Sequence, residues 1–204
     1  MRILNFGQKI DGKQQSVYVI IYTLEFYPWS HYPNMPRNAI ELNVPVALLI
    51  SRYDGKMGFA GGGIEQGESL YEGLKREAYE EINTDLETHK DNLESIVTIE
   101  TERKVIHLFG LEVNFKELLH IQKNSVEAQH FGNEISGTIM VHLHDYPEER
   151  GLITVLKSQF SQAVAEGLLY FLRKKMLYST SHLVYLGKKA GLDIDHFFQT
   201  ELNH

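Results

Sequence analysis

The stretch from Gly61 to Ile82 constrains the fold of this chain more than any other part of its sequence. Three consecutive glycines, Gly61 to Gly63, come shortly before a run in which apolar residues recur at i, i+4 and i+8 (Leu70, Leu74 and Ala78). This spacing predicts a helix from Ser69 to Ile82 that buries one face, with Ser69 as its cap. Because Gly61 and Gly62 have no side chains, the backbone before the helix can approach a bound group closely.

The same helix is expected to carry three acids on one face. Glu77, Glu80 and Glu81 are spaced i, i+3 and i+4, which brings their carboxylates together. Like charges at this spacing destabilise a helix by roughly 0.2–0.5 kcal/mol per pair. A divalent cation reverses that effect, since Mg²⁺ and Mn²⁺ prefer hard oxygen ligands. Taken alone, three glutamates more often form a solvated acidic face than a metal site.

The joint spacing of the glycines, the acids and one arginine favours the metal site. Gly62 is followed after five residues by Glu68, after seven more by Arg76-Glu77-Ala78, and one residue later by Glu80-Glu81. This pattern resembles the Nudix box, G-x5-E-x7-R-E-U-x-E-E-x-G-U, in which U is an aliphatic residue. All the charged positions of the box match. The chain is therefore identified as a member of the Nudix hydrolase superfamily.

Two positions depart from the box. Asn83 stands in place of the last glycine and Thr84 in place of the last aliphatic residue. Asn is the next most suitable residue for the left-handed conformation at a helix C-terminus, so the first change is mild. The resemblance implies an α/β/α sandwich with a mixed sheet and C-terminal helices.

The catalytic roles follow from the resemblance. It implies that Glu80 and Glu81 are the principal ligands of a Mg²⁺ or Mn²⁺ ion, with Glu77 as a further ligand or as the group that orients the attacking water. Gly61 is expected to contribute to the metal site through its backbone. The cation would neutralise pyrophosphate charge, and a water with a lowered pKa would attack phosphorus.

Three further residues of the box are expected to be structural. The resemblance implies that Arg76 and Glu68 form an ion pair that fixes the loop and the helix. Gly62, like Gly61, is expected to let the backbone approach the metal and the phosphates closely. Nudix enzymes often use another acid from outside the box. Glu134, just before a predicted strand, is the candidate for this catalytic role, and Glu127 is the reserve. An exposed loop glutamate is the alternative for Glu134.

Sequence similarity extends beyond the box toward one branch of the superfamily. Residues 51–59, 105–109 and 130–137 are similar to the U8 small-nucleolar-RNA decapping enzymes, which also hydrolyse inosine diphosphates, and residues 156–160 match more loosely at the start of a predicted long helix. This similarity implies that Arg52 and Phe59 line a nucleotide pocket and that Gln159 closes it. The alternatives are an exposed cation for Arg52 and a core aromatic for Phe59.

Tyr18 is expected to contact the substrate from a strand position where this branch has a base-contacting histidine. A tyrosine can stack on a purine and donate through its hydroxyl, but it does not exchange a proton near neutral pH. A preference for inosine is therefore in doubt, whereas the cleavage chemistry is not.

The rest of the chain predicts a mixed α/β or α+β fold. Strands are expected at about 17–22, 44–52, 95–101, 104–113 and 135–143, with a hairpin turn at 53–56. Helices are expected at 115–123 and 155–177, followed by one or two short helices after Ser181. Residues 28–36 are expected to form an ordered loop. The length of 204 residues fits a single domain, 1–204, with a helical C-terminal segment from about residue 155.

Composition limits the partners of the protein. The formal net charge is −7 and there is no cysteine, which disfavours general coating of nucleic acids and excludes a thiolate nucleophile. No apolar run approaches the roughly 20 residues of a membrane span, and no signal peptide is recognised, so an intracellular location in cytoplasm or nucleus is expected. The expected partner is a nucleotide or a capped RNA, with ADP-ribose or dinucleoside polyphosphates, or a binding-only role, as alternatives. Apolar residues of the long helix and Phe197-Phe198 could pair two subunits as a homodimer or cover the protein's own sheet.

Overall fold

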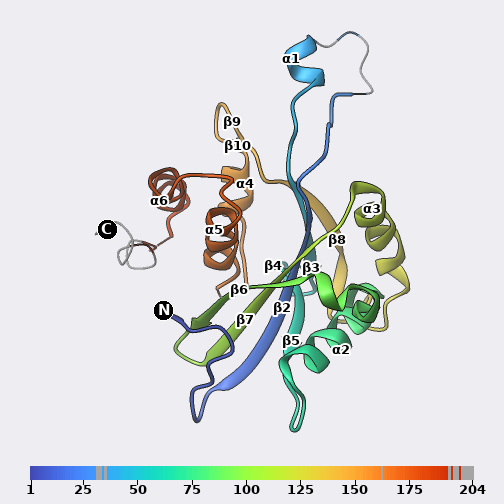
Figure 1. Cartoon of the computed structure of the whole chain (residues 1–204), viewed down its shortest axis with the longest axis vertical. Coiled ribbons are helices and arrows are strands. Elements are labelled where there is room, and N and C mark those ends of the chain that lie inside the picture. The colour runs from blue at the N-terminus through green and yellow to red at the C-terminus, as the bar shows by residue number, and fades with distance from the viewer. Residues whose placement is uncertain (31–33, 35, 162, 193, 195–197, 199–204) are drawn as a thin grey trace.

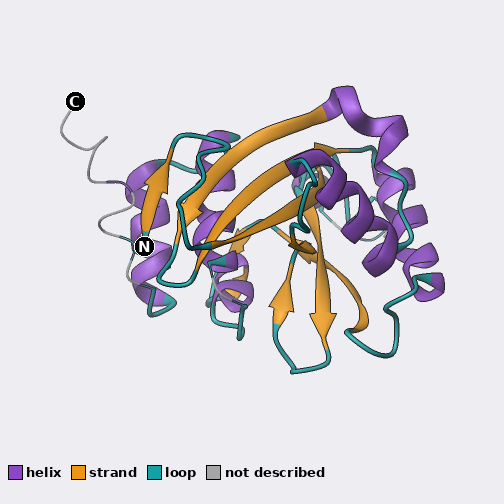
Figure 2. Ribbon diagram, turned by 90° about the horizontal axis from the view of Figure 1, so that it is seen from below, coloured by secondary structure: helices purple, strands orange, loops and turns teal. Residues whose placement is uncertain are grey.

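A mixed β-sheet lies at the centre of the protein, between two layers of helices (Figures 1 and 2). The computed structural model describes residues 1–30, 34, 36–161, 163–192, 194 and 198. Eight strands form this sheet: β1 (Arg2–Leu4), β2 (Gln14–Thr23), β3 (Val46–Arg52), β4 (Met57–Gly58), β5 (Ala60–Gly63), β6 (Leu93–Glu100), β7 (Lys104–Glu112) and β8 (Ile135–His142). The order is β1-β6-β7-β2-β3-β4, with β5 on β2 and β8 on β3. A separate hairpin joins β9 (Asp145–Tyr146) to β10 (Arg150–Gly151).

Strand β2 organises the sheet because its two edges are used differently. Along one edge it pairs in parallel with β7 over residues 14–22. The other edge is shared, since residues 16–19 pair antiparallel with β5 and residues 21–23 pair antiparallel with β3. The glycine-rich strand β5 and the end of β3 therefore diverge from one point on β2. Tyr18 lies opposite Gly61 at this fork.

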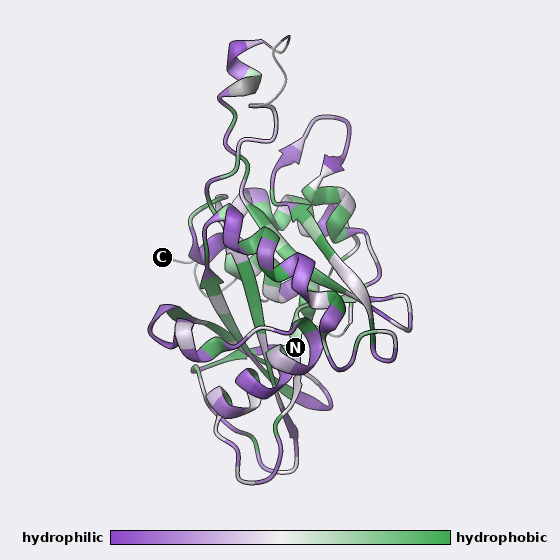
Figure 3. Cartoon of the chain, turned by 90° about the vertical axis from the view of Figure 1, so that its right-hand side faces the viewer, coloured by the Kyte–Doolittle hydropathy of each residue, from purple (hydrophilic) through white to green (hydrophobic). Residues whose placement is uncertain are grey.

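Helices cover both faces of the sheet. One face carries α2 (Leu70–Ile82), α3 (Phe115–Asn124) and the 3-10 turns at Leu86–Asn92 and Ser125–Glu127; the other carries α4 (Leu152–Leu156), α5 (Val164–Lys174) and α6 (Thr180–Lys189). The short helix α1 (Arg37–Ile40) lies in an arm away from the sheet (Figure 1). Side chains of β2 alternate between the two cores: Val17 and Val19 face α2, and Ile20 faces α5. Figure 3 shows the apolar strands enclosed between helices with polar outer faces.

Helix α2 forms as its sequence predicts. Ser69 and Glu72 make a reciprocal capping box at its start, and Leu74, Ala78 and Ile82 are fully buried against the sheet. The helix ends at Asn83, which adopts the left-handed conformation with φ 51° and ψ 42°. Asn83 thus does what the glycine of the box would do.

Replacing Ser69 by alanine is expected to lower the free energy of unfolding by about 1 kcal/mol, because the Glu72 backbone N–H loses its acceptor at the helix start. Chemical denaturation measures the difference. Ser69→Asp is the matched control, since a carboxylate caps the same N–H. Equal losses in both variants would contradict a capping role.

The other predicted elements are mostly confirmed, with one clear error. The strands and the helix at 115–124 lie within a few residues of their predicted positions, and α6 is one of the predicted short helices. The single long helix predicted at 155–177 is wrong, because α4 ends at Leu156 and α5 begins at Val164. The reason is tertiary pairing: Met57 donates to the Gln159 carbonyl (2.8 Å), and Ser161 donates to the Met57 carbonyl (2.9 Å). These bonds draw the segment onto β4, out of the helical path that its apolar spacing favours.

Helix α5 covers the protein's own sheet. Its buried residues Leu168, Leu169 and Phe171 belong to the core on that face, so the apolar spacing no longer argues for pairing two subunits. Phe198 is buried as well, whereas Phe197 and part of the predicted loop at 28–36 lie outside the described residues. In the part of the chain that the structure describes, no helix has the length and apolarity needed to cross a membrane.

Candidate active site

Two glycines bring the end of β5 into direct contact with α2. The Gly61 N–H donates to Glu81 Oε2 at 2.7 Å, and a Cβ at Gly62 would lie 2.5 Å from Glu77 Oε1. Gly61 has φ +142°, and a Cβ there would lie 2.1 Å from the Val17 carbonyl oxygen. No side chain fits at either position, so both acids rest against bare backbone.

Arg76 ties the loop to the helix. Its Nε and Nη2 make a bidentate pair with Glu68 (2.8 and 3.0 Å), and Nη2 also donates to the Gly63 carbonyl (2.8 Å). Its Nη1 bonds to Glu77 (2.9 Å) and Glu80 (3.1 Å). The predicted partnership of Arg76 with Glu68 is present in this geometry, and one guanidinium also neutralises two of the three candidate metal ligands.

Changing Arg76 to lysine is expected to lower the free energy of unfolding by about 1.5 kcal/mol, because an ammonium keeps the charge but loses the planar fork. Urea unfolding of the metal-free protein measures the loss. Arg37→Lys is the control, since the Arg37–Glu41 pair is exposed at 89% and 61% and such pairs contribute little. A loss at Arg76 no larger than at Arg37 would contradict the assigned role.

Glu81 is the most buried acid of the group, at 2% exposure. Burial raises the pKa of its carboxyl to about 8, although the Gly61 N–H acts in the opposite direction. The charges of Glu77 and Glu134 raise this pKa further, and the charge of Arg52 lowers it. Burial also raises the pKa of Glu77, against the effect of Arg76. Desolvation by the fold thus makes both carboxylates favour a bound cation or a proton.

Two predicted substrate residues lie around Glu81. Burial raises the pKa of the Tyr18 hydroxyl, and the Glu81 charge raises it further while the Arg52 charge lowers it, so the three groups are close enough to interact. Arg52 ends β3, where its Nε lies 3.5 Å from Asp54 in the hairpin turn. It is half-buried, in contrast to the exposed cation that was its alternative.

The other two predicted substrate residues are placed differently. Phe59 is 1% exposed and packs in the α5-side core, which matches the alternative of a core aromatic and offers no surface to a nucleotide. Gln159 is exposed, but it lies in the segment before α5 instead of opening a helix. Its carbonyl is held by Met57 of β4, next to the strand that carries Arg52.

A loop outside the box, from His130 to Glu134, lies beside the glutamates of α2. Its His130 N–H donates to the carbonyl of Glu80 (2.8 Å), and the Glu134 carbonyl accepts from Tyr53 N–H (3.0 Å). Glu134 is therefore brought beside the box acids, with its side chain 56% exposed. Glu127, the reserve candidate, lies in the preceding 3-10 turn. His130 was not among the predicted residues; its position four residues before Glu134 was the available signal.

The acids fit a hard divalent cation by their chemistry. Glu77, Glu80 and Glu81 supply oxygen donors on one side of α2, and Gly62 leaves the space that Glu77 fills. Among the described residues, however, no three histidines, aspartates or glutamates converge as a ready-made cluster. Two of these carboxylates bond to Arg76 Nη1 instead. Arg76 keeps separate partners in Glu68 and the Gly63 carbonyl, so its anchoring does not depend on those two bonds.

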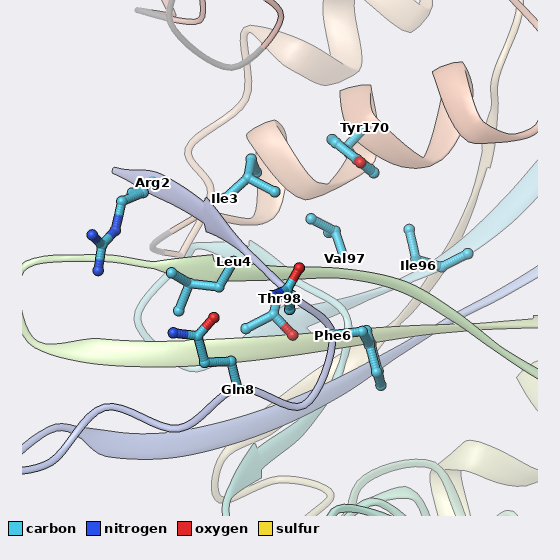
Figure 4. Close-up of a pocket in the computed structure, with 10 residues that line it drawn as sticks. Arg2, Ile3, Leu4, Phe6, Gln8, Ile96, Val97, Thr98 and Tyr170 are labelled. Carbon is cyan, nitrogen blue, oxygen red and sulfur yellow. The ribbon is translucent and has the colours of Figure 1, made fainter. Parts of the chain in front are cut away.

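A large cavity lies elsewhere in the molecule. It has a volume of about 610 Å³ and is lined by residues of β1 and β6, by Phe6 and Gln8 after β1, and by Tyr170 of α5 (Figure 4). No residue of the predicted site lines it. The size of a cavity is therefore a poor guide to the chemistry of this protein.

Known proteins share sequence similarity with much of this chain. The Nudt16-like (U8 snoRNA-decapping enzyme-like) family model matches residues 17–178. The chain is 36% identical over 100 residues to a U8 snoRNA-decapping enzyme of Homalodisca vitripennis, covering 48% of this chain and 54% of that one. It is 30% identical over 156 residues to a Tudor-interacting repair regulator protein of Gallus gallus, covering 71% and 49%. The chain thus spans about half the length of these curated relatives.

A solved structure supports the fold. A MutT/nudix family protein from Enterococcus faecalis superimposes with a TM-score of 0.54 at 13% identity, covering 88% of this chain and 70% of that one. At this identity the likeness concerns the fold alone. The predicted mixed α/β architecture is confirmed.

Proposed function

Because the chain belongs to the Nudt16-like family of U8 snoRNA-decapping enzyme-like Nudix proteins, we propose that it is a divalent-metal-dependent hydrolase. It cleaves a phosphoanhydride bond in capped RNA or in a purine nucleoside di- or triphosphate. The observation that carries this proposal is the carboxylate of Glu81, buried beside Glu77 and held by the Gly61 N–H. A buried acid in such surroundings is better explained by a bound cation than by stability, since burying an unpaired charge is costly.

The acids of the box would hold Mg²⁺ or Mn²⁺. In this role Glu80 and Glu81 are the principal ligands, with Glu77 and the backbone of Gly61 beside them. A bound cation supplies neutralisation of the phosphate charge and lowers the pKa of the attacking water. Arg76 keeps the helix and the loop in register through Glu68 and the Gly63 carbonyl.

Glu134 is the group that receives the proton in this proposal. Water attacks phosphorus, the bond from phosphorus to the bridging oxygen breaks, and the proton of the water passes to the Glu134 carboxylate. Its place beside the box acids and its exposed side chain support this role. The acid comes from a separate loop whose backbone is bonded to α2 at Glu80 and to Tyr53 after β3.

The nucleotide would bind over the end of β3. Arg52 supplies a cation for phosphate, Tyr18 supplies a ring and a hydroxyl, and Gln159 borders the site from the segment before α5. Phe59 is not part of this proposed pocket because its ring is in the core. The reaction is proposed to take place inside the cell, in nucleus or cytoplasm, in one Nudix domain spanning residues 1–204; a homodimer stays a prediction.

A protein-binding role is the second candidate. The Gallus gallus relative, which is aligned with 71% of this chain, is named a Tudor-interacting repair regulator protein. The retained glutamates and Arg76 favour hydrolysis over a role in binding alone, since they have no evident purpose in a surface that only docks a partner.

A hydrolysis screen tests the proposal. Purified protein with Mg²⁺ or Mn²⁺ is given inosine diphosphate, ADP-ribose, a diadenosine polyphosphate and a capped RNA. Turnover of inosine diphosphate or capped RNA supports the proposed substrate class. Turnover confined to ADP-ribose or the dinucleotide keeps the chemistry and rejects that class, and no turnover with either metal rejects the enzyme and favours the binding role.

A further inference from the structure

The loop from His130 to Glu134 is bonded at one end to α2 and at the other to the residue that follows β3. At one end the His130 N–H bonds to the Glu80 carbonyl, and at the other the Glu134 carbonyl accepts from Tyr53 N–H, one residue beyond Arg52. The His130 carbonyl also accepts backbone N–H groups from residues 133, 134 and 135, at 3.0–3.2 Å. The backbone of His130 therefore holds this loop in place, and the His130 side chain takes no part in these bonds.

The imidazole of His130 has one nitrogen with no hydrogen-bond partner. Its Nδ1 is buried, although the side chain as a whole is 25% exposed. A buried polar atom without a partner is uncommon and costs free energy. Glu134 Oε1 lies 4.0 Å from this nitrogen, beyond hydrogen-bond range by about 1 Å. The ring also lies close enough to Glu77 for a protonated imidazole to lower the pKa of that carboxyl.

We propose that His130 is the positioning residue for Glu134, whose carboxylate accepts a hydrogen bond from His130 Nδ1–H and is thereby held toward the box acids. The Glu134 side chain is 56% exposed, so solvent surrounds much of it and it has room to turn toward Nδ1. The bond fixes one carboxylate oxygen and leaves the other for the attacking water. This inference rests on the proposed function only in giving Glu134 the proton-accepting role; the bond itself does not depend on it.

The position of the proton on the ring is a direct test without any activity. Protein labelled with ¹⁵N-histidine is examined by NMR with and without Mg²⁺, and His130→Ala assigns the signals. The neutral ring is expected to carry its proton on Nδ1, and Glu134→Ala is expected to shift the ring away from this tautomer because the acceptor is lost. An unprotonated Nδ1 in the wild type, or a tautomer unaffected by Glu134→Ala, overturns the assignment.

Kinetics test whether the ring acts through Glu134. His130→Ala is expected to lower kcat roughly 10- to 100-fold, the usual effect of losing the partner that orients an active-site ligand, with KM nearly unchanged. In a Glu134→Ala background the same change should have no further effect, because there is nothing left to position. Multiplicative losses, or an unchanged kcat, contradict the proposal.

Conservative variants separate the two ring nitrogens. An asparagine amide reaches the place of Nδ1 and a glutamine amide that of Nε2, so His130→Asn should recover most of kcat and His130→Gln should not. His120→Ala is the matched control, since His120 is an exposed histidine on α3 that bonds to Asn124. Equal recovery by Asn and Gln overturns the role of Nδ1. If the wild type hydrolyses no substrate, the proposed function fails, and the NMR measurement still decides the bond.

Discussion

Replacing Glu80 and Glu81 together by glutamine is expected to lower metal-dependent hydrolysis by at least about 10³-fold. The two substitutions keep the size of the side chains and remove two of the carboxylate ligands, and metal stabilisation of transition-state charge contributes several kcal/mol. The rate on whichever substrate the wild type cleaves, measured across a range of Mn²⁺ concentrations, gives the loss. Calorimetry of Mn²⁺ binding to the same variant measures the ligand role directly.

Stability provides the control for this pair of substitutions. A glutamine at position 81 can still accept the Gly61 N–H, so the double variant should fold and melt at least as high as the metal-free wild type. Glu117→Gln, in the first turn of α3 and outside the box, is the matched acid-to-amide control and should leave the rate unchanged. A folded double variant that retains the wild-type rate of hydrolysis would contradict the metal-site assignment.

Metal-free protein is expected to lose about 2 kcal/mol of stability as the pH rises from 6.5 to 8. The pKa of Glu81 is raised to about 8 in the folded state from an ordinary 4.5, so the folded protein binds the proton more tightly. This contribution is complete below pH 4.5 and is lost as pH rises through 8, at about 1.4 kcal/mol per pH unit. Denaturant midpoints in a chelating buffer measure the change.

The pH range starts at 6.5 so that the titration of His107 contributes little to the measured change in stability. His107 is buried between Thr98 and Gln15, and burial lowers its pKa from 6.5 to about 4, so its contribution to stability is lost as pH falls from 6.5 to 4. Burial also lowers the pKa of His142, and above pH 6.5 both histidines add only a small rise in stability, so the loss from the buried acids dominates. Glu81→Gln should flatten the profile, and saturating Mg²⁺ should reduce its slope, because the cation stabilises the charged carboxylate. A wild-type stability that rises over this range would contradict the burial of Glu81.

Local sequence determined the parts of the protein that depend on short-range physics. The capping box at Ser69, the apolar face of α2 and the left-handed Asn83 follow from residue types at fixed spacing, and each is present in the structure. The box acids were placed together for the same reason, since i, i+3 and i+4 share one side of a helix. Strands β2, β3, β6, β7 and β8 were also predictable, because each is a short run rich in apolar residues, many of them β-branched or aromatic.

Only the tertiary structure decided what happens between distant segments. Residues 157–161 leave the helical path because β4 offers their backbone hydrogen bonds, and Phe59 is taken into the core because β4 and β5 turn its ring toward α5. The pKa of Glu81 depends on how deeply the sheet and the glycine turn bury it. His130 meets the acids only because its backbone N–H finds the Glu80 carbonyl, 50 residues earlier in the chain. Helical spacing depends on residues that are three or four positions apart in the sequence. Burial and contacts between loops arise only when remote elements pack together.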